Sequence, residues 1–123
     1  MKVLLLGTGH ALIKIMGGHY SRCHSCSSNE EYLKIIQEAD QIIMLDSHLD
    51  MHPDVLATVM KEPWADKVIE AYGKNFDIII DEITHLKMNR SRYYKDEAMR
   101  LLKLDGVFYG RTSSGETVKA LKR

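Results

Sequence analysis

A short glycine-containing turn near the N-terminus has the residue types needed to admit a ligand close to the backbone. Gly7, Thr8 and Gly9 follow the apolar residues 3–6, and His10 comes next, where we predict that a helix begins. Glycines in the turn after a first strand let the main chain approach a ligand that a Cβ atom would keep away. The same residues also suit a tight turn without a ligand, and both interpretations stay open for this motif alone.

An acidic residue further along the chain favours the ligand interpretation. Asp46 ends the apolar run 41–46, and an acid at the end of a second strand can accept hydrogen bonds from both hydroxyls of a ribose. Its separation from Gly9 is longer than the about 20 residues of the dinucleotide fingerprint, and the polar segment 16–28 accounts for the excess. Asp46 is alternatively a solvated strand end or a cap. Together with the glycines it predicts a nucleoside site.

Two clusters with metal-ligand chemistry do not lead us to predict a metal. Cys23 and Cys26 form one CxxC in a polar loop, whereas a closed zinc site needs four ligands and no second CxxC exists. An alternation of histidine and aspartate around Pro53 would put metal-ligating side chains on one face if the segment is extended, but Pro53 favours a connecting loop instead, as does the family resemblance described below. The members of the alternation are His48, Asp50, His52 and Asp54.

The arrangement of apolar runs predicts the elements that position these residues. Strand-like runs cover 2–7, 41–46, 54–59, 76–81 and 106–110. Helical spacing of apolar residues covers 27–39 and 91–106. Because strands and helices alternate, we expect an α/β fold with a mostly parallel sheet and right-handed crossovers.

Composition restricts the class of protein. The 123 residues suffice for one domain, 1–123, and Lys plus Arg equals Asp plus Glu at 17 each, so no strong overall charge attracts nucleic acid or anionic lipid. The basic and aromatic residues 90–95 make nucleic-acid binding possible but do not indicate it. No stretch is long and apolar enough for a signal peptide or a membrane span. We expect a cytoplasmic protein.

The order of several motifs resembles class I S-adenosylmethionine-dependent methyltransferases. These motifs are VLLLGTGHA, IIMLDSHLDMHPDVLATVMKEPW, FDIIIDEITHL and EAMRLLKLDGVFYG. The resemblance implies a three-layer Rossmann-like domain with S-adenosylmethionine as cofactor. The chain departs from the family at Thr58, where relatives often carry an acid, and at LDG, where they carry proline and two glycines.

The resemblance also implies roles for individual residues. Gly7, Thr8, Gly9 and His10 would lie beside the methionine part of the cofactor, Asp46 would bind the ribose, and Val59 and Met60 would contact the adenine. Asp81 and Glu82 would open the pocket toward an unknown methyl acceptor.

Methyl transfer requires alignment of the acceptor and, for an oxygen or acidic nitrogen, removal of a proton. His85, just beyond the run 76–81, is the base that we predict, because imidazole titrates near neutral pH. Glu82 and His10 are weaker candidates for orienting a substrate. A surface or capping role for His85 is the alternative.

The C-terminal tail is short for the family. Only 13 residues follow Gly110, too few for a helix and the usual antiparallel pair of strands. We therefore expect about five strands without that pair, and an open edge at 106–110 that the tail folds over or that a homodimer covers. The missing substrate region keeps a second function open, a non-catalytic cofactor-binding or scaffold protein. A third and weaker hypothesis is a nucleotide-linked oxidoreductase or other Rossmann-type enzyme, and the presence of Leu12 in place of a third glycine argues against it.

Overall fold

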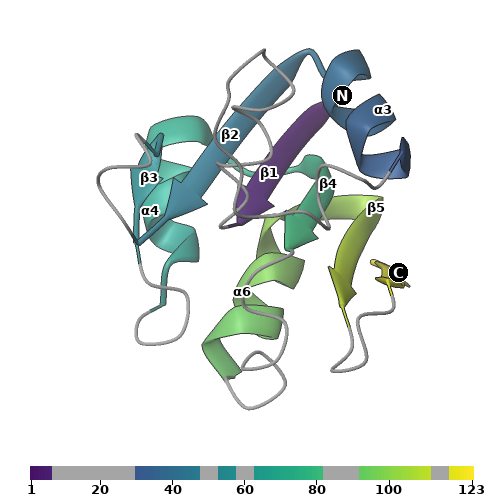
Figure 1. The fold of residues 1–123 in the computed structure, drawn as a ribbon. Coiled ribbons are helices and arrows are strands. Elements are labelled where there is room, and N and C mark those ends of the chain that lie inside the picture. The colour runs from purple at the N-terminus through teal and green to yellow at the C-terminus, as the bar shows by residue number, and fades with distance from the viewer. Residues whose placement is uncertain (7–29, 48–52, 58–62, 82–91, 112–116) are drawn as a thin grey trace.

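The structure, a computed structural model, describes residues 1–6, 30–47, 53–57, 63–81, 92–111 and 117–123. These residues form an α/β fold with one six-stranded sheet in the order β3-β2-β1-β4-β5-β6 (Figure 1). The strands are β1 (Lys2–Leu6), β2 (Gln41–Asp46), β3 (Val55–Leu56), β4 (Phe76–Asp81), β5 (Leu102–Arg111) and β6 (Thr117–Leu121). The helices are α3 (Glu30–Glu38), α4 (Ala65–Tyr72) and α6 (Arg92–Leu101).

The sheet corrects the expected number and arrangement of strands. The prediction of about five strands lacking an antiparallel pair is wrong, because residues 117–121 form β6 and pair antiparallel with β5. An antiparallel pair of strands needs no helix between its members, so the short tail after Gly110 can supply the second strand of the pair. The other neighbouring strands are parallel, as the alternation of runs and helices predicts. The edge at 106–110 is therefore covered by the tail.

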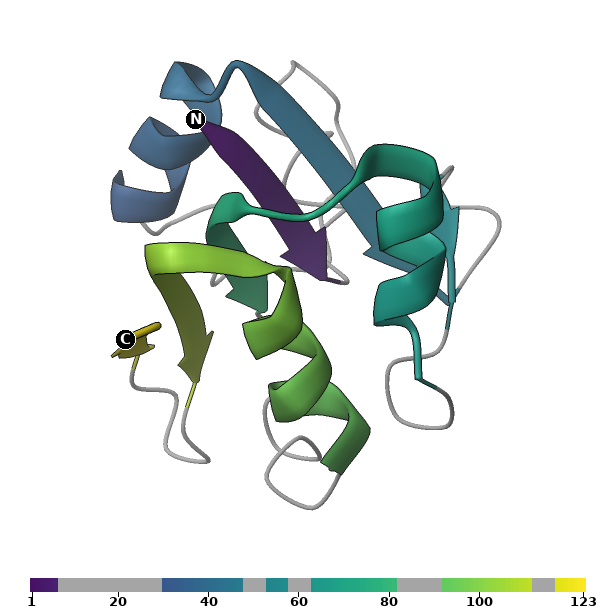
Figure 2. The same ribbon diagram turned by 180° about the vertical axis from the view of Figure 1, so that it is seen from behind.

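Helices pack on both faces of the sheet and divide its core into two. Helices α4 and α6 lie on one face and α3 on the other (Figures 1 and 2). Side chains of each strand alternate between the faces: Leu4 and Leu6 of β1 join the core under α4 and α6, while Val3 and Leu5 join the core under α3. The central strands are apolar on both sides, as strands of a covered parallel sheet are.

Several element boundaries differ from those predicted. The helix predicted over 91–106 ends at Leu101, and β5 begins at once with Leu102 instead of residue 106. Asp105 has a φ of 66°, and a Cβ atom at Gly106 would lie 2.9 Å from the carbonyl oxygen of Lys103. The chain therefore needs a glycine where it changes register against β4. The strand predicted over 54–59 is Val55–Leu56.

Helix α4 was absent from the predicted elements. Its residues Ala65, Val68, Ile69 and Tyr72 have helical spacing and pack on the core, so the sequence did contain the signal. The helix ends at Gly73, whose φ is 80° and whose N–H donates to the carbonyl of Ile69. Within the described part of the chain, no helix is long and apolar enough to cross a membrane.

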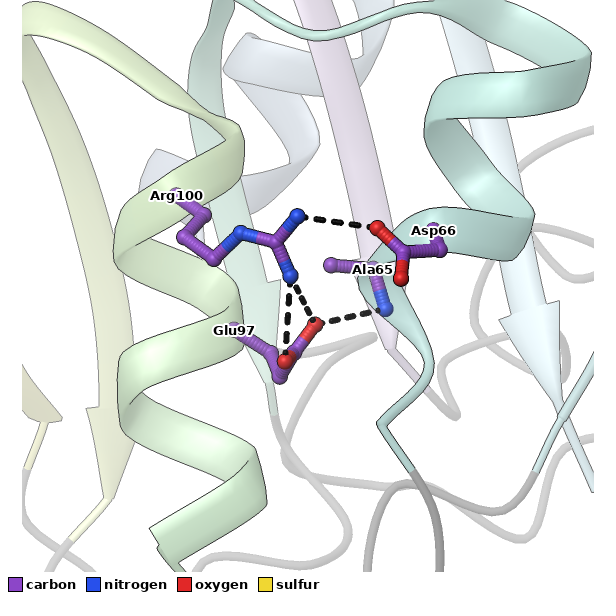
Figure 3. A network of polar contacts seen from close by, with 4 residues as sticks. All are labelled: Ala65, Asp66, Glu97 and Arg100. Atoms are coloured by element: carbon purple, nitrogen blue, oxygen red, sulfur yellow. Dashed lines mark hydrogen bonds and ion pairs between the residues drawn. The ribbon is translucent and has the colours of Figure 1, made fainter.

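The N-terminus of α4 is capped by a side chain from another helix. Trp64, in the N-cap position, makes no side-chain capping hydrogen bond. Instead the buried Glu97 of α6 accepts a hydrogen bond from the backbone N–H of Ala65 at 2.9 Å. Arg100 contacts both carboxylate oxygens of Glu97 and reaches Asp66 at 2.8 Å (Figure 3). Glu97 thus stabilises α4 and fixes it beside α6.

Replacing Glu97 by alanine should destabilise the fold. The Glu97→Ala change leaves the N–H of Ala65 without its cap, which we expect to cost about 1–3 kcal/mol in the free energy of unfolding. Asp66→Asn, which removes the exposed pair with Arg100 and a negative charge from the first turn of α4, should cost clearly less. Urea unfolding followed by the fluorescence of Trp64, the only tryptophan, measures both. Equal losses would show that the hydrogen bond from Ala65 to Glu97 adds no more stability than an exposed ion pair.

Asp77 connects neighbouring strands at the opposite end of the sheet, where the parallel strands begin. Its carboxylate accepts a hydrogen bond from the backbone N–H of Lys2 at 2.7 Å and forms an ion pair with Lys103. The hydrogen bond from Lys103, followed by that from Lys2, lowers the pKa of Asp77. Asp77 of β4 thereby joins the starts of β1 and β5.

The lowered pKa predicts a loss of stability in acid. As pH falls through the ordinary range of an aspartate, the unfolded chain takes up a proton at position 77 before the folded chain does. The contribution of Asp77 is therefore complete above that range and lost below it. Asp77→Asn should flatten this part of the stability curve, and Lys103→Met should flatten it partly. Urea unfolding at a series of pH values measures the slopes, and an unchanged slope in Asp77→Asn contradicts the assignment.

Candidate functional site

The carboxyl ends of the central strands bring two predicted site residues to one edge of the sheet. Leu6, the last residue of β1, pairs with Leu45 of β2 on one side and with Asp81 of β4 on the other. Asp46 follows Leu45, so the two acids flank the end of β1. The strand order reverses between β1 and β4, and ligands of open α/β sheets bind at such a switch point.

Asp46 is the more accessible of the two acids. It is partly buried, and its backbone carbonyl accepts a hydrogen bond from Ala57 at 3.0 Å, which holds the end of β2 against β3. Ile43 and Leu45 of β2 face α4 and α6, so the alternation along the strand places Asp46 on the α3 side. A carboxylate in this place can accept hydrogen bonds from a ligand above the edge.

Asp81 is fully buried, with a relative exposure of 0%. Ile78 and Ile80 face α3, so alternation along β4 places Asp81 on the side of α4 and α6. Burial of a carboxylate is costly, and such groups concentrate at functional sites. In this structure, however, Asp81 exposes no surface to a ligand.

The two acids therefore share an edge but belong to opposite faces of the sheet. The register fixes their strands on either side of β1, while the alternation of side chains separates their carboxylates. A ligand over the end of β1 on the α3 side meets Asp46 first. The predicted role of Asp81 toward the substrate stays a prediction.

Asp54, one of the four residues of the histidine and aspartate alternation, has a structural role. Its carboxylate accepts a hydrogen bond from the N–H of Met44 at 2.8 Å, and its own N–H donates to the carbonyl of Met44 at 2.9 Å. Asp54 therefore fastens the start of β3 to β2. Among the described residues, no group of three or more potential ligands could hold a metal ion.

The other predicted site residues lie outside the described residues. These are Gly7, Thr8, Gly9, His10, Val59, Met60, Glu82 and His85, together with Cys23, Cys26, His48, Asp50 and His52. Their predicted roles stay predictions.

Trp64 is a residue of this region that the motifs did not single out. It immediately precedes α4, is fully buried, and its indole Nε1 has no acceptor among the described residues. Helix α4 begins beside the carboxyl ends of the strands (Figure 2), so Trp64 lies at the same end of the strands as Asp46 but in the core under α4 and α6, on the opposite face of the sheet. The sequence offers no signal for this burial apart from the apolar spacing of α4.

Comparisons with models of protein families, with curated proteins and with solved structures found no match for this chain. The fold itself is a mixed, mostly parallel α/β sheet whose strand order is 3-2-1-4-5-6.

Proposed function

We propose that the chain binds S-adenosylmethionine over the carboxyl end of β1 and transfers its methyl group to an acceptor. The observation that carries the proposal is the register of β1, β2 and β4, which sets Asp46 beside the point where the chain leaves β1 for the glycine segment. An acid in that position can hold a ribose. The motif order described above supports the choice of cofactor.

The charge at this edge suits the proposed cofactor. Asp46 and Asp81 are both acidic, and S-adenosylmethionine carries a sulfonium cation and no phosphate. Asp81 is buried on the other face of the sheet, so Asp46 is the acid that a ligand on the α3 side would meet. The carboxylate of Asp46 supplies two acceptor oxygens for the two ribose hydroxyls. An acid in this place suits the ribose of an adenosine and of a dinucleotide alike, so the choice of S-adenosylmethionine rests on the motif order.

A non-catalytic cofactor-binding protein is the second candidate. The observation that favours it is the complete burial of Asp81, because the acid at the switch point then offers no proton acceptor to a substrate. Methyl transfer in this chain would depend on His85 or Glu82 for that step. The two candidates share the binding site and differ only in turnover.

Asp46→Asn should weaken cofactor binding at least about tenfold, since the ribose hydroxyls lose a charged acceptor worth roughly 1.5–3 kcal/mol. Calorimetric titration with S-adenosylmethionine, its demethylated product and NAD measures the affinities. The matched control is Asp105→Asn, an exposed acid at the opposite edge whose φ of 66° asparagine also tolerates. This control should bind as the wild type does.

Three results would contradict the binding proposal. They are no binding of either sulfur compound to the wild type, equal affinities of Asp46→Asn and wild type, and a preference for NAD. Thermal unfolding of each variant, followed at Trp64, separates a binding defect from a folding defect.

His85→Gln tests the step beyond binding. If imidazole removes the acceptor's proton, the variant should keep the cofactor affinity of the wild type and lose about 100-fold or more in turnover. Release of S-adenosylhomocysteine in the presence of small-molecule, peptide and nucleic-acid acceptors measures turnover. Equal rates in variant and wild type remove His85 from the mechanism, whereas binding without turnover of any acceptor by the wild type favours the non-catalytic candidate.

A further inference from the structure

The outer edge of β6 carries main-chain groups that face away from the sheet. Lys122, just after β6, donates its N–H to the carbonyl of Gly106 and accepts a hydrogen bond from the N–H of Asp105. Because main-chain groups alternate in direction along a strand, Ala120 and Val118 also turn toward β5. Thr117, Lys119 and Leu121 turn their N–H and C=O groups outward, where β6 is the last strand of the sheet (Figure 1).

The described part of the sheet has two edge strands, and β6 is the longer of them. The opposite edge is β3, which has two residues, whereas β6 has five. A strand of five residues with no proline and one lysine has little protection against pairing with another strand. The chemistry that satisfies such an edge is a further β-strand.

We propose that β6 pairs antiparallel with β6 of a second copy of this chain, about a two-fold axis at Ala120. Each Lys119 then lies opposite Leu121 of the partner subunit, and the outward N–H and C=O groups of these residues pair with one another. A two-fold axis uses the same surface on both copies, so every donor of one edge meets an acceptor of the other. The sheet becomes continuous across the dimer.

The charge of Lys119 is compatible with this register. Its Nζ lies 2.7 Å from a carboxylate oxygen of Glu31 in α3 and 5.2 Å from the centre of the Tyr109 ring. Each cation is therefore balanced within its own copy. A register centred on Lys119 would place the two lysines directly opposite one another, which like charges disfavour. Centring on Ala120 avoids that conflict.

Exposed apolar surface next to the edge also favours a second copy. Leu121 is 53% exposed, and it lines an open groove on the α3 side of β5 and β6 together with Val107, Tyr109, Lys119 and Arg123. The groove ends at the free edge of β6. In the proposed dimer, the aliphatic stem of the partner's Lys119 covers Leu121, and the two grooves join into one.

Proline at position 119 tests the pairing. Lys119→Pro removes an outward N–H and leaves the hydrogen bonds between β6 and β5 in place, a position where strands tolerate proline. Lys119→Ala is the matched control, because it loses the contact with Glu31 but keeps the N–H. Sedimentation equilibrium should give twice the chain mass of 14.1 kDa for wild type and Lys119→Ala, and a single chain mass for Lys119→Pro.

Amide hydrogen exchange tests the register in the unaltered protein. The N–H groups of Lys119 and Leu121 should be protected at high protein concentration and should exchange faster on dilution, while those of Val118 and Ala120, which face β5, should stay protected throughout. A wild type that is a single chain at all concentrations, with fast exchange at 119 and 121, overturns the proposal. So does a dimer that Lys119→Pro leaves intact. Neither outcome bears on cofactor binding, because Asp46 lies at the end of β2, whereas the proposed contact between copies is made by β6.

Discussion

The pairing of β1 on both of its sides is the constraint on which the rest of the structure depends. Val3, Leu4, Leu5 and Leu6 are at most 1% exposed, and the strand forms parallel ladders with β2 and β4. A shift of one residue in either ladder would turn apolar side chains of one core toward the other, and a shift in the ladder with β2 would also move Asp46 away from the end of β1. The register that buries the core is therefore the same register that sets the candidate site.

The N-terminus of α4 is capped by a residue that is distant in the sequence and belongs to α6. The N-cap position of α4 is Trp64, whose side chain has no oxygen that could accept a hydrogen bond from the first N–H groups of the helix. Glu97, 32 positions after Ala65, supplies the carboxylate. Because Arg100 holds that carboxylate and also contacts Asp66, the two helices are joined where α4 starts. The start of α4 thus depends on α6, and with it the position of Trp64 in the core.

The sequence allowed the parallel part of the sheet to be predicted, since β2 and β4 have the bounds expected from their apolar runs. It did not reveal β6, because TVKAL is short, has two polar residues among its five, and becomes a strand only by pairing with β5. The cap on Ala65 by Glu97 was equally hidden, since contacts between distant residues leave no local pattern. For the site, residue types predicted Asp46 at the end of its strand, whereas Asp81 was named only because the family resemblance implies it; the register brings both to one end of the sheet. The complete burial of Asp81 depends on packing that no spacing encodes.

The contacts of Tyr109 connect the C-terminal strand to the element that precedes Asp46. Its hydroxyl donates a hydrogen bond to Glu31 of α3 at 3.0 Å, and Lys119 of β6 pairs with the same carboxylate oxygen. Burial, followed by the hydrogen bond to Glu31, raises the pKa of Tyr109, so the phenol stays protonated and keeps its role as donor. Helix α3 leads directly into β2, which ends at Asp46. The antiparallel strand that closes the sheet therefore also helps to hold α3 over the face toward which Asp46 points.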